Sequence, residues 1–252
     1  MIQSLHVQGF ASLLPFATLA DFPDGPTIDL PRPDLGLLQP TLRRGLSDVT
    51  RMFMHTAQAV LQQANVPADQ VHVVFASAFG EISAAEQLLG QAYEQDASSP
   101  VRFRNSVHNT AAGLLSISAK SLLPSTAIAA GWDTVAMGLL EASSLLADRA
   151  ERVLLVYAEE RVPQALSAEH QHGPLSAALL LSLSPVRSRG VIGNLRRLSV
   201  APAPCDFQGQ NHPLSPCVSL CRALTQGART TVPVGDGDEP WCVDVSPVSE
   251  TS

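Results

Sequence analysis

The sequence has few charged and few aromatic side chains, and its basic residues never form a long run. Charged residues make up 15% and aromatic residues 5% of the 252 positions, and the net charge at pH 7 is −7. Proteins that bind nucleic acid carry clustered lysines and arginines, because each neutralised phosphate adds to the affinity. Here Arg43 with Arg44 and Arg196 with Arg197 are no more than pairs. The composition therefore argues against a nucleic-acid partner.

Long hydrophobic runs are also missing. No apolar stretch reaches the roughly 18 residues that a bilayer-spanning helix needs. Pro15 interrupts the apolar start of the chain, which also lacks the basic residues of a signal peptide. We therefore expect no membrane partner and a cytoplasmic location. The four cysteines, at 205, 217, 221 and 242, are expected to be reduced thiols in that compartment.

The motifs of common catalytic and cofactor sites are absent as well. The sequence contains no Gly-x-Ser-x-Gly motif and no glycine-rich phosphate loop, and residues 235–239 have the composition of a hairpin turn. Cys217 and Cys221, with His212 before them, supply too few ligands for a structural zinc site. The same applies to the two histidines within 169–173. We expect buried thiols, no metal and no cofactor.

What the sequence does contain is a succession of strand and helix patterns. Strands are predicted over 4–14, 71–80, 125–131, 152–160 and 174–184, helices over 47–65, 81–96, 106–121, 133–147 and 213–227, and a hairpin over 230–246. Ser47 is expected to cap the first helix, and Asn65 to end it. Because the strands are apolar throughout, the pattern indicates an α/β fold with a mostly parallel sheet and buried helices on both faces.

Two of these helices carry hardly any polar residues. The segments 106–121 and 133–147 are rich in alanine, glycine, serine and leucine, and an amphipathic surface helix would show a polar face. We therefore expect both helices to be sandwiched, either between two sheets or against another chain.

Three segments, in their order and spacing, resemble β-ketoacyl-acyl-carrier-protein synthases. "NTAAGLLSI" at 109–117 is similar to their Asn-x-x-Ala-Gly segment, and "LPSTAIAAGWDT" at 123–134 to the segment that ends in Thr-Ala-Cys. "GPLSAALLLS" at 173–182 is similar to the strand before the link to their C-terminal half. The resemblance implies half of a thiolase-like fold. "LQPTLRRGLSDVTRM" at 38–52 is similar to half-length synthase-like proteins of aryl polyene and related pathways.

The resemblance also divides the chain and locates the position of the family's nucleophile. It implies a ketosynthase-like N-terminal domain over 1–190 and a C-terminal extension over 191–252, a helix plus a hairpin packed on the same domain or on a partner. Counted from Pro124, the family's catalytic cysteine falls on Trp132. A thiolate at a helix N-terminus can accept an acyl chain, whereas an indole cannot, so we expect no catalytic residue in this chain.

A partner follows from the same resemblance. Chain-length factors are synthase relatives without the cysteine that pair with a complete synthase in type II fatty acid and polyketide systems. By this resemblance Arg102, Phe103, Ser106 and His108, together with Trp132, meet a complete β-ketoacyl synthase as a heterodimer or a pair of heterodimers, and line its acyl tunnel. The acyl carrier protein is then an indirect partner.

Other interpretations stay open at this point. Trp132 is expected at an interface, but it could be a core aromatic, and Asp133 is expected to cap the following helix rather than to act as an acid. Ser106 and His108 lie two residues apart and would not face each other on a helix. The chain could still be a stand-alone acyltransferase or condensing enzyme with an atypical nucleophile, such as His108, Ser106 or Cys205. A weaker alternative is a module that only docks carrier protein.

Overall fold

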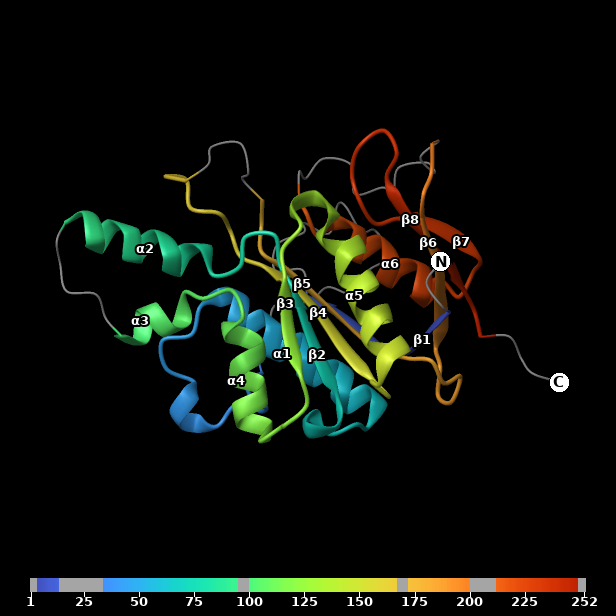
Figure 1. Cartoon of the computed structure of the whole chain (residues 1–252), viewed down its shortest axis with the longest axis horizontal. Helices are drawn as coiled ribbons and strands as arrows, with labels where there is room; N and C mark the ends of the chain where they lie inside the picture. The colour runs from blue at the N-terminus through green and yellow to red at the C-terminus, as the bar shows by residue number, and fades with distance from the viewer. Residues whose placement is uncertain (1–3, 14–33, 95–99, 167–171, 200–211, 249–252) are drawn as a thin grey trace.

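The computed structural model describes residues 4–13, 34–94, 100–166, 172–199 and 212–248, which form an α/β fold around one eight-stranded sheet (Figure 1). The strands are β1 (Leu5–Leu13), β2 (His72–Ala76), β3 (Ser125–Ile128), β4 (Val153–Glu159), β5 (Leu175–Ser182), β6 (Gly190–Arg197), β7 (Thr230–Pro233) and β8 (Trp241–Ser246). The α-helices are α1 (Asp48–Ala64), α2 (Ile82–Tyr93), α3 (Pro100–Asn105), α4 (Thr110–Ala119), α5 (Thr134–Asp148) and α6 (Ser215–Gln226). Short 3-10 turns are η2 (Pro40–Leu42), η3 (Ala68–Gln70) and η4 (Gly131–Asp133).

The sheet is mostly antiparallel, so the prediction of a mostly parallel sheet was wrong. Its order is β3-β2-β4-β5-β1-β6-β8-β7. Only β2 runs parallel to its neighbours β3 and β4. The pairs β4–β5, β5–β1, β1–β6, β6–β8 and β8–β7 are antiparallel. The α/β class itself is confirmed.

The error has a physical cause in the burial of the central strands. Every residue of β4 and of β5 is buried, because helices cover both faces of the sheet there. A strand covered on both faces is apolar throughout whichever way its neighbour runs, so composition alone does not reveal direction. The connection between β4 and β5 did indicate their direction. No helix pattern lies between them, whereas parallel neighbours need a long crossover, so an antiparallel pair was the better prediction.

Helix α1 forms where its capping residues predicted it. The side chain of Ser47 accepts a hydrogen bond from the backbone N–H of Thr50 at 3.0 Å, which satisfies one of the free donors of the first turn. Asn65 ends the helix in the left-handed conformation, with φ 53°. The apolar positions between them, such as Phe53 and Val60, are fully buried. The predicted helix 47–65 is confirmed.

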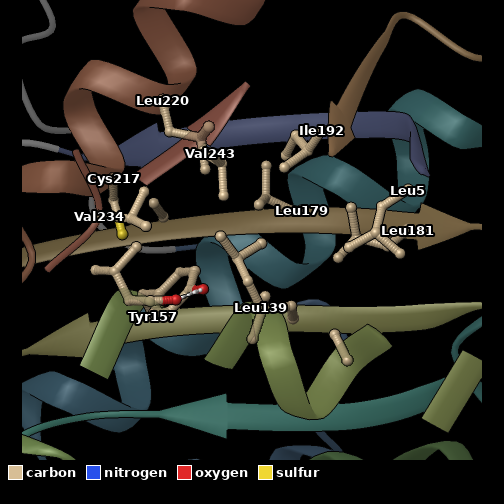
Figure 2. Close-up of a cluster of buried hydrophobic side chains, with 14 of the residues drawn as sticks. Leu5, Leu139, Tyr157, Leu179, Leu181, Ile192, Cys217, Leu220, Val234 and Val243 are labelled. Atoms are coloured by element: carbon tan, nitrogen blue, oxygen red, sulfur yellow. Dashed lines mark hydrogen bonds between the residues drawn. The ribbon is translucent and has the colours of Figure 1, made fainter. Parts of the chain in front are cut away.

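Helices cover the two faces of the sheet and enclose two hydrophobic cores. One core lies between the sheet and α5 with α6, and the other between the sheet and α1 with α4 (Figure 1). Figure 2 shows the first core, in which Leu139 of α5 and Cys217 of α6 approach Tyr157 and Leu179 of the central strands. Tyr157 is fully buried and satisfies its hydroxyl by donating to the backbone carbonyl of Val135 at 2.8 Å.

The two apolar helices are covered on one face only. The predicted helix 106–121 begins later than expected, as α4 at Thr110, because the Thr110 hydroxyl donates to the carbonyl oxygens of Arg104 and Val107 and closes a turn before the helix. Ile117 of α4 is 61% exposed, and Leu140 of α5 is 42% exposed. The sheet buries their inner faces, while the outer faces are open in the single chain.

The residues after 190 extend the sheet. Strands β6, β8 and β7 continue it beyond β1, and α6 packs against the same face as α5. The helix predicted over 213–227 and the hairpin predicted over 230–246 correspond to α6 and to the β7–β8 pair. Strand β6 was not predicted, because its sequence alternates only weakly between buried and exposed positions. The division of the chain at residue 190 stays a prediction.

Close packing of α5 on β4 gives a testable prediction at Gly138. A Cβ atom placed there would lie 2.8 Å from the Tyr157 ring, and the fully buried, hydrogen-bonded ring cannot move aside. We expect Gly138→Ala to lower the free energy of unfolding by about 2 kcal/mol, measured by urea unfolding. Gly113→Ala in α4, where a Cβ meets nothing within 4 Å, is the matched control and should not destabilise. Equal effects of both substitutions would contradict this packing.

Candidate functional site

The turn that carries Trp132 joins β3 to α5. Gly131 has a φ of 55°, a left-handed conformation that suits glycine. The hydroxyl of Thr134 donates to the carbonyl oxygen of Gly131 at 2.7 Å and accepts from the backbone N–H of Ala130 at 3.2 Å, which holds the turn closed. Trp132 is therefore placed, half-buried, in the 3-10 turn directly before α5.

Asp133 does not cap α5 as expected. It occupies the N-cap position, but its side chain makes no capping hydrogen bond. Instead, its Oδ1 accepts from the backbone N–H of Asp236 at 3.3 Å, and its Oδ2 lies 3.9 Å from the Arg197 guanidinium. Gly235 fits this contact because a Cβ there would lie 2.5 Å from Asp133 Oδ1. Asp236 lies in the loop between β7 and β8, and Arg197 lies in β6. These C-terminal residues therefore pack directly against the Trp132 turn.

The cysteines within the described residues are poor nucleophiles. Burial raises the pKa of the Cys221 thiol to about 12 and that of Cys217 well above its ordinary value. Cys242 is also buried. A thiol that stays protonated at neutral pH does not attack an acyl group. Cys205, the remaining candidate of the enzyme alternative, lies outside the described residues.

His108 and Ser106, the other candidates for a hidden nucleophile or base, do not pair with each other. His108 Nε2 donates to the carbonyl oxygen of Ser77 at 3.0 Å, and its ring packs against Phe75 with centroids 5.5 Å apart. The hydroxyl of Ser106 donates to the carbonyl oxygen of Phe103 at 2.9 Å. Both side chains are thus held by backbone groups, in the turn before α4 rather than on a helix.

An open groove lies beside the edge of the sheet. Its volume is about 450 Å³, and it is lined by His108, Asn109, Ser125, Thr126, Ala127 and Ala129. Strand β3 is the end strand of the sheet, and among the described residues it pairs only with β2. The other edge of β3 therefore presents backbone donors and acceptors to whatever enters the groove.

Most exposed large hydrophobic side chains lie in the part of the chain from α2 to α5. Of eleven such side chains in the described residues, eight lie between residues 89 and 140. We call these eight the apolar flank: Leu89, Tyr93, Val101, Phe103, Val107, Ile117, Leu122 and Leu140. Phe103 is 65% exposed on α3, next to the exposed Arg102. Exposed apolar side chains that concentrate in one part of a chain favour an interaction site there.

The residues predicted for the partner surface thus fall into separate places. Arg102, Phe103 and Ser106 belong to α3 and the turn after it, His108 lines the groove, and Trp132 lies in the turn after β3. Sequence reasoning missed three buried glutamates. Glu159 and Glu160 lie at the end of β4, and Glu81 lies directly before α2. A signal existed, because two consecutive glutamates end the most apolar strand pattern of the chain.

Within the described residues, no group of three or more His, Cys, Asp or Glu side chains could hold a metal ion. No helix among the same residues is both long and apolar enough to span a bilayer.

A family model matches most of the chain. The model described as "Beta-ketoacyl synthase, N-terminal domain" matches residues 20–242. A comparison with curated proteins finds no match.

Solved structures of ketosynthase complexes have the same fold. One chain of the complex between the ketosynthase ApeO and its chain length factor ApeC from Xenorhabdus doucetiae is 22% identical, with a TM-score of 0.73 over 96% of this chain and 99% of that chain. A chain of the ishigamide ketosynthase/chain length factor is 13% identical, with a TM-score of 0.68 over 96% and 99%. A β-ketoacyl synthase from Burkholderia phymatum is 12% identical, with a TM-score of 0.56 over 79% and 64%. The thiolase-like expectation for the fold is confirmed.

Proposed function

The chain belongs to the β-ketoacyl synthase N-terminal domain family, and from this premise we propose that it is a non-catalytic, chain-length-factor-like subunit that pairs with a complete β-ketoacyl synthase. The observation that carries the proposal is the Trp132 turn. It has the position before α5 that the resemblance gives to the nucleophile, but it holds an indole, which offers an N–H donor and no acyl acceptor. The decarboxylative condensation of malonyl-carrier protein with the acyl-enzyme then belongs to the partner.

The open side of the single chain supports a protein partner. Each of α4 and α5 exposes a large apolar side chain on its outer face, Ile117 and Leu140, and the free edge of β3 belongs to the same part of the fold. Exposed apolar area and an unpaired strand edge both favour association, because covering them removes apolar surface from water and satisfies backbone groups. A complete synthase of the same fold supplies a matching edge and matching helices.

The roles of individual residues follow from where they lie. We assign Arg102, Phe103, Ser106 and His108, with Trp132, to the surface that meets the synthase and lines its acyl tunnel. Their bulk would limit chain growth, because an apolar tunnel that is already filled accepts no further methylenes. Phe103, with its large exposed ring, is the residue on which this part of the proposal depends most.

The setting is the type II assembly of fatty acids or polyketides. We propose an aryl polyene pathway, based on the segment at 38–52 and on the likeness to ketosynthase and chain length factor complexes. The synthase is then the direct partner in a cytoplasmic complex, as one pair or two, and the acyl carrier protein meets this chain only within that complex. Residues 1–190 form the synthase-like part of the subunit, and residues 191–252 its extension.

Co-expression tests the proposal. The tagged chain is expressed with the β-ketoacyl synthase encoded nearest to it, purified by affinity, and weighed intact by native mass spectrometry. We expect a stable complex of equal numbers of both chains, and self-association of the chain alone. Within the active complex, Phe103→Ala and Trp132→Ala should change the length of the product, which mass spectrometry of the released acyl chains measures.

A different outcome would favour the enzyme alternative. A chain that remains monomeric, ignores the synthase and becomes acylated by an acyl donor or a cerulenin-like electrophile would overturn the proposal. Binding of carrier protein without any change in product length would instead favour a docking module.

A further inference from the structure

Three buried carboxyl groups surround the segment that leads from β2 into α2. Glu159 Oε1 accepts hydrogen bonds from the hydroxyl of Ser77 at 2.9 Å and from the backbone N–H of Ala78. Glu160 Oε1 accepts from the backbone N–H of Ser83 at 2.9 Å, in the first turn of α2. The two glutamates at the end of β4 therefore hold this segment at both of its ends.

The third carboxyl group connects the same segment to α1. Glu81 immediately precedes α2, and its Oε1 accepts from the hydroxyl of Thr50 at 2.7 Å. Its Oε2 is buried and has no hydrogen-bond partner among the described residues. Glu81, Glu159 and Glu160 are 2%, 0% and 4% exposed. An ionised carboxylate at such a position is costly unless another group neutralises it.

The charged groups that act on these carboxyls are themselves acidic. Asp48 of α1 and the carboxyls themselves repel one another, which adds to the effect of burial. On the other side, His108 bonds the Ser77 carbonyl, and His172 stacks on Phe79 with His212 beside it. Burial lowers the pKa of His212 to about 3, so that ring is neutral.

The same burial sets the protonation of the glutamates. It raises the pKa of Glu159 to about 8 and that of Glu81 to about 7, against the hydrogen bonds that favour the ionised form, and it raises the pKa of Glu160 as well. None of the ion pairs within the described residues involves these three groups. At pH 7 a bound proton therefore neutralises Glu159, whereas Glu81 titrates near that pH.

Helix α2 is only partly covered. None of its twelve residues, all of which the structure describes, is buried, and the helix extends away from the sheet and contacts α3 (Figure 1). The segment 77–83 and the carboxyls bonded to it are what connect its N-terminus to the sheet and to α1. Leu89 and Tyr93 of the apolar flank lie at the far end of this helix.

We propose that Glu81, Glu159 and Glu160 form a proton-dependent latch that holds the N-terminus of α2 against the ends of β2 and β4, and that releases the helix as the carboxyls ionise. The sign follows from linkage. Because the carboxyl pKa values are raised in the folded state, the stabilisation is complete below about pH 4.5 and is lost as the pH rises through about 7 to 8. The consequence for the partner, weaker docking of α2 at alkaline pH, rests on the proposed function.

Hydrogen–deuterium exchange of the full chain tests the latch. Exchange of the α2 amides is measured between about pH 6 and about pH 8.5, after correction for the intrinsic rate at each pH. We expect α2 to lose about tenfold or more of its protection across this range, since opening then releases protons that the closed form binds. Amides of α5, whose first turn holds none of these carboxyls, should change much less.

Two substitutions and a matched control complete the test. Glu159→Gln and Glu81→Gln keep the acceptor oxygen but cannot ionise, so each should reduce the pH response of α2 protection, and Glu159→Gln should reduce it more because its carboxyl has the higher pKa. Glu94→Gln, at the exposed end of α2, should behave as the native chain. The native titration decides the outcome even if one variant does not fold. The latch would be overturned if α2 protection in the native chain did not change with pH. It would also be overturned if both glutamine variants showed the same pH response as the native chain.

A second readout separates the latch from the proposed function. Recovery of the synthase complex should fall between about pH 6 and about pH 8.5 for the native chain, and should fall less for Glu159→Gln. If the synthase does not bind at either pH while the exchange result holds, the pairing is wrong and the latch stands. If the complex forms but α2 exchange does not respond to pH, the latch is wrong and the pairing stands.

Discussion

Ile117→Asp should abolish the complex with the synthase while leaving the chain itself folded. Ile117 is 61% exposed on the outer face of α4, so in the free chain an aspartate there is solvated and costs little. In the complex the same carboxylate would be buried against apolar surface without a partner, which typically costs several kcal/mol. We expect affinity to fall by about a hundredfold or more, measured by titration of the labelled chain into the synthase.

Val186→Asp is the matched control for this prediction. Val186 is 65% exposed, comparable to Ile117, but it lies between β5 and β6, outside the apolar flank. The same change of charge there should leave affinity within about twofold. If both substitutions weakened binding equally, a general effect of charge would explain the result. If neither did, α4 would not face the partner.

Phe75→Ala should remove a large part of the stability of the chain. Phe75 is fully buried in β2, where its ring meets Phe53 edge-on at 5.4 Å and packs against the His108 ring. Truncating a buried phenylalanine leaves a cavity and costs about 3–5 kcal/mol, against a total of about 5–15 kcal/mol for most domains. Urea unfolding of the dilute chain, followed by circular dichroism, measures the loss.

A smaller substitution at the same place separates volume from ring contacts. Phe75→Leu keeps most of the volume and should cost about 1.5 kcal/mol or less. Because the His108 ring rests on Phe75, the alanine variant should also loosen the groove beside β3, which faster exchange of the His108 and Asn109 amides would report. A loss below about 1 kcal/mol in Phe75→Ala would show that the neighbouring helices close over the cavity.

The sequence predicted those elements whose signals are local. Helix α1 was placed by Ser47 and Asn65, and α6 by Gly227, because capping is a matter of a few neighbouring residues. Strand direction was not predictable in the same way, because β5 is fully buried between β4 and β1 whichever way they run. Strand β6 was missed because one face of it is partly exposed and its apolar pattern is interrupted.

In the candidate site, too, local features were predictable from the sequence and long-range contacts were not. The turn before α5 could be located because glycine and a short spacing define it, which placed Trp132 at the start of a helix. The contact of Asp133 with Arg197 and Asp236 joins segments far apart in the sequence, so local reasoning assigned it to a cap instead. The three buried glutamates were missed for the same reason, since their donors come from β2, α1 and α2.

The place of β1 in the sheet has a consequence for the order of folding. Strand β1 pairs with β5 and β6, which are synthesised more than 160 residues after it. The parallel strands β2, β3 and β4 are synthesised in between, so β1 remains unpaired until β5 and β6 follow β4. Contacts of such long sequence separation form slowly and leave nascent chains open to aggregation. Translation together with a partner that shelters the early strands would then matter as much for the yield of this protein as its final stability.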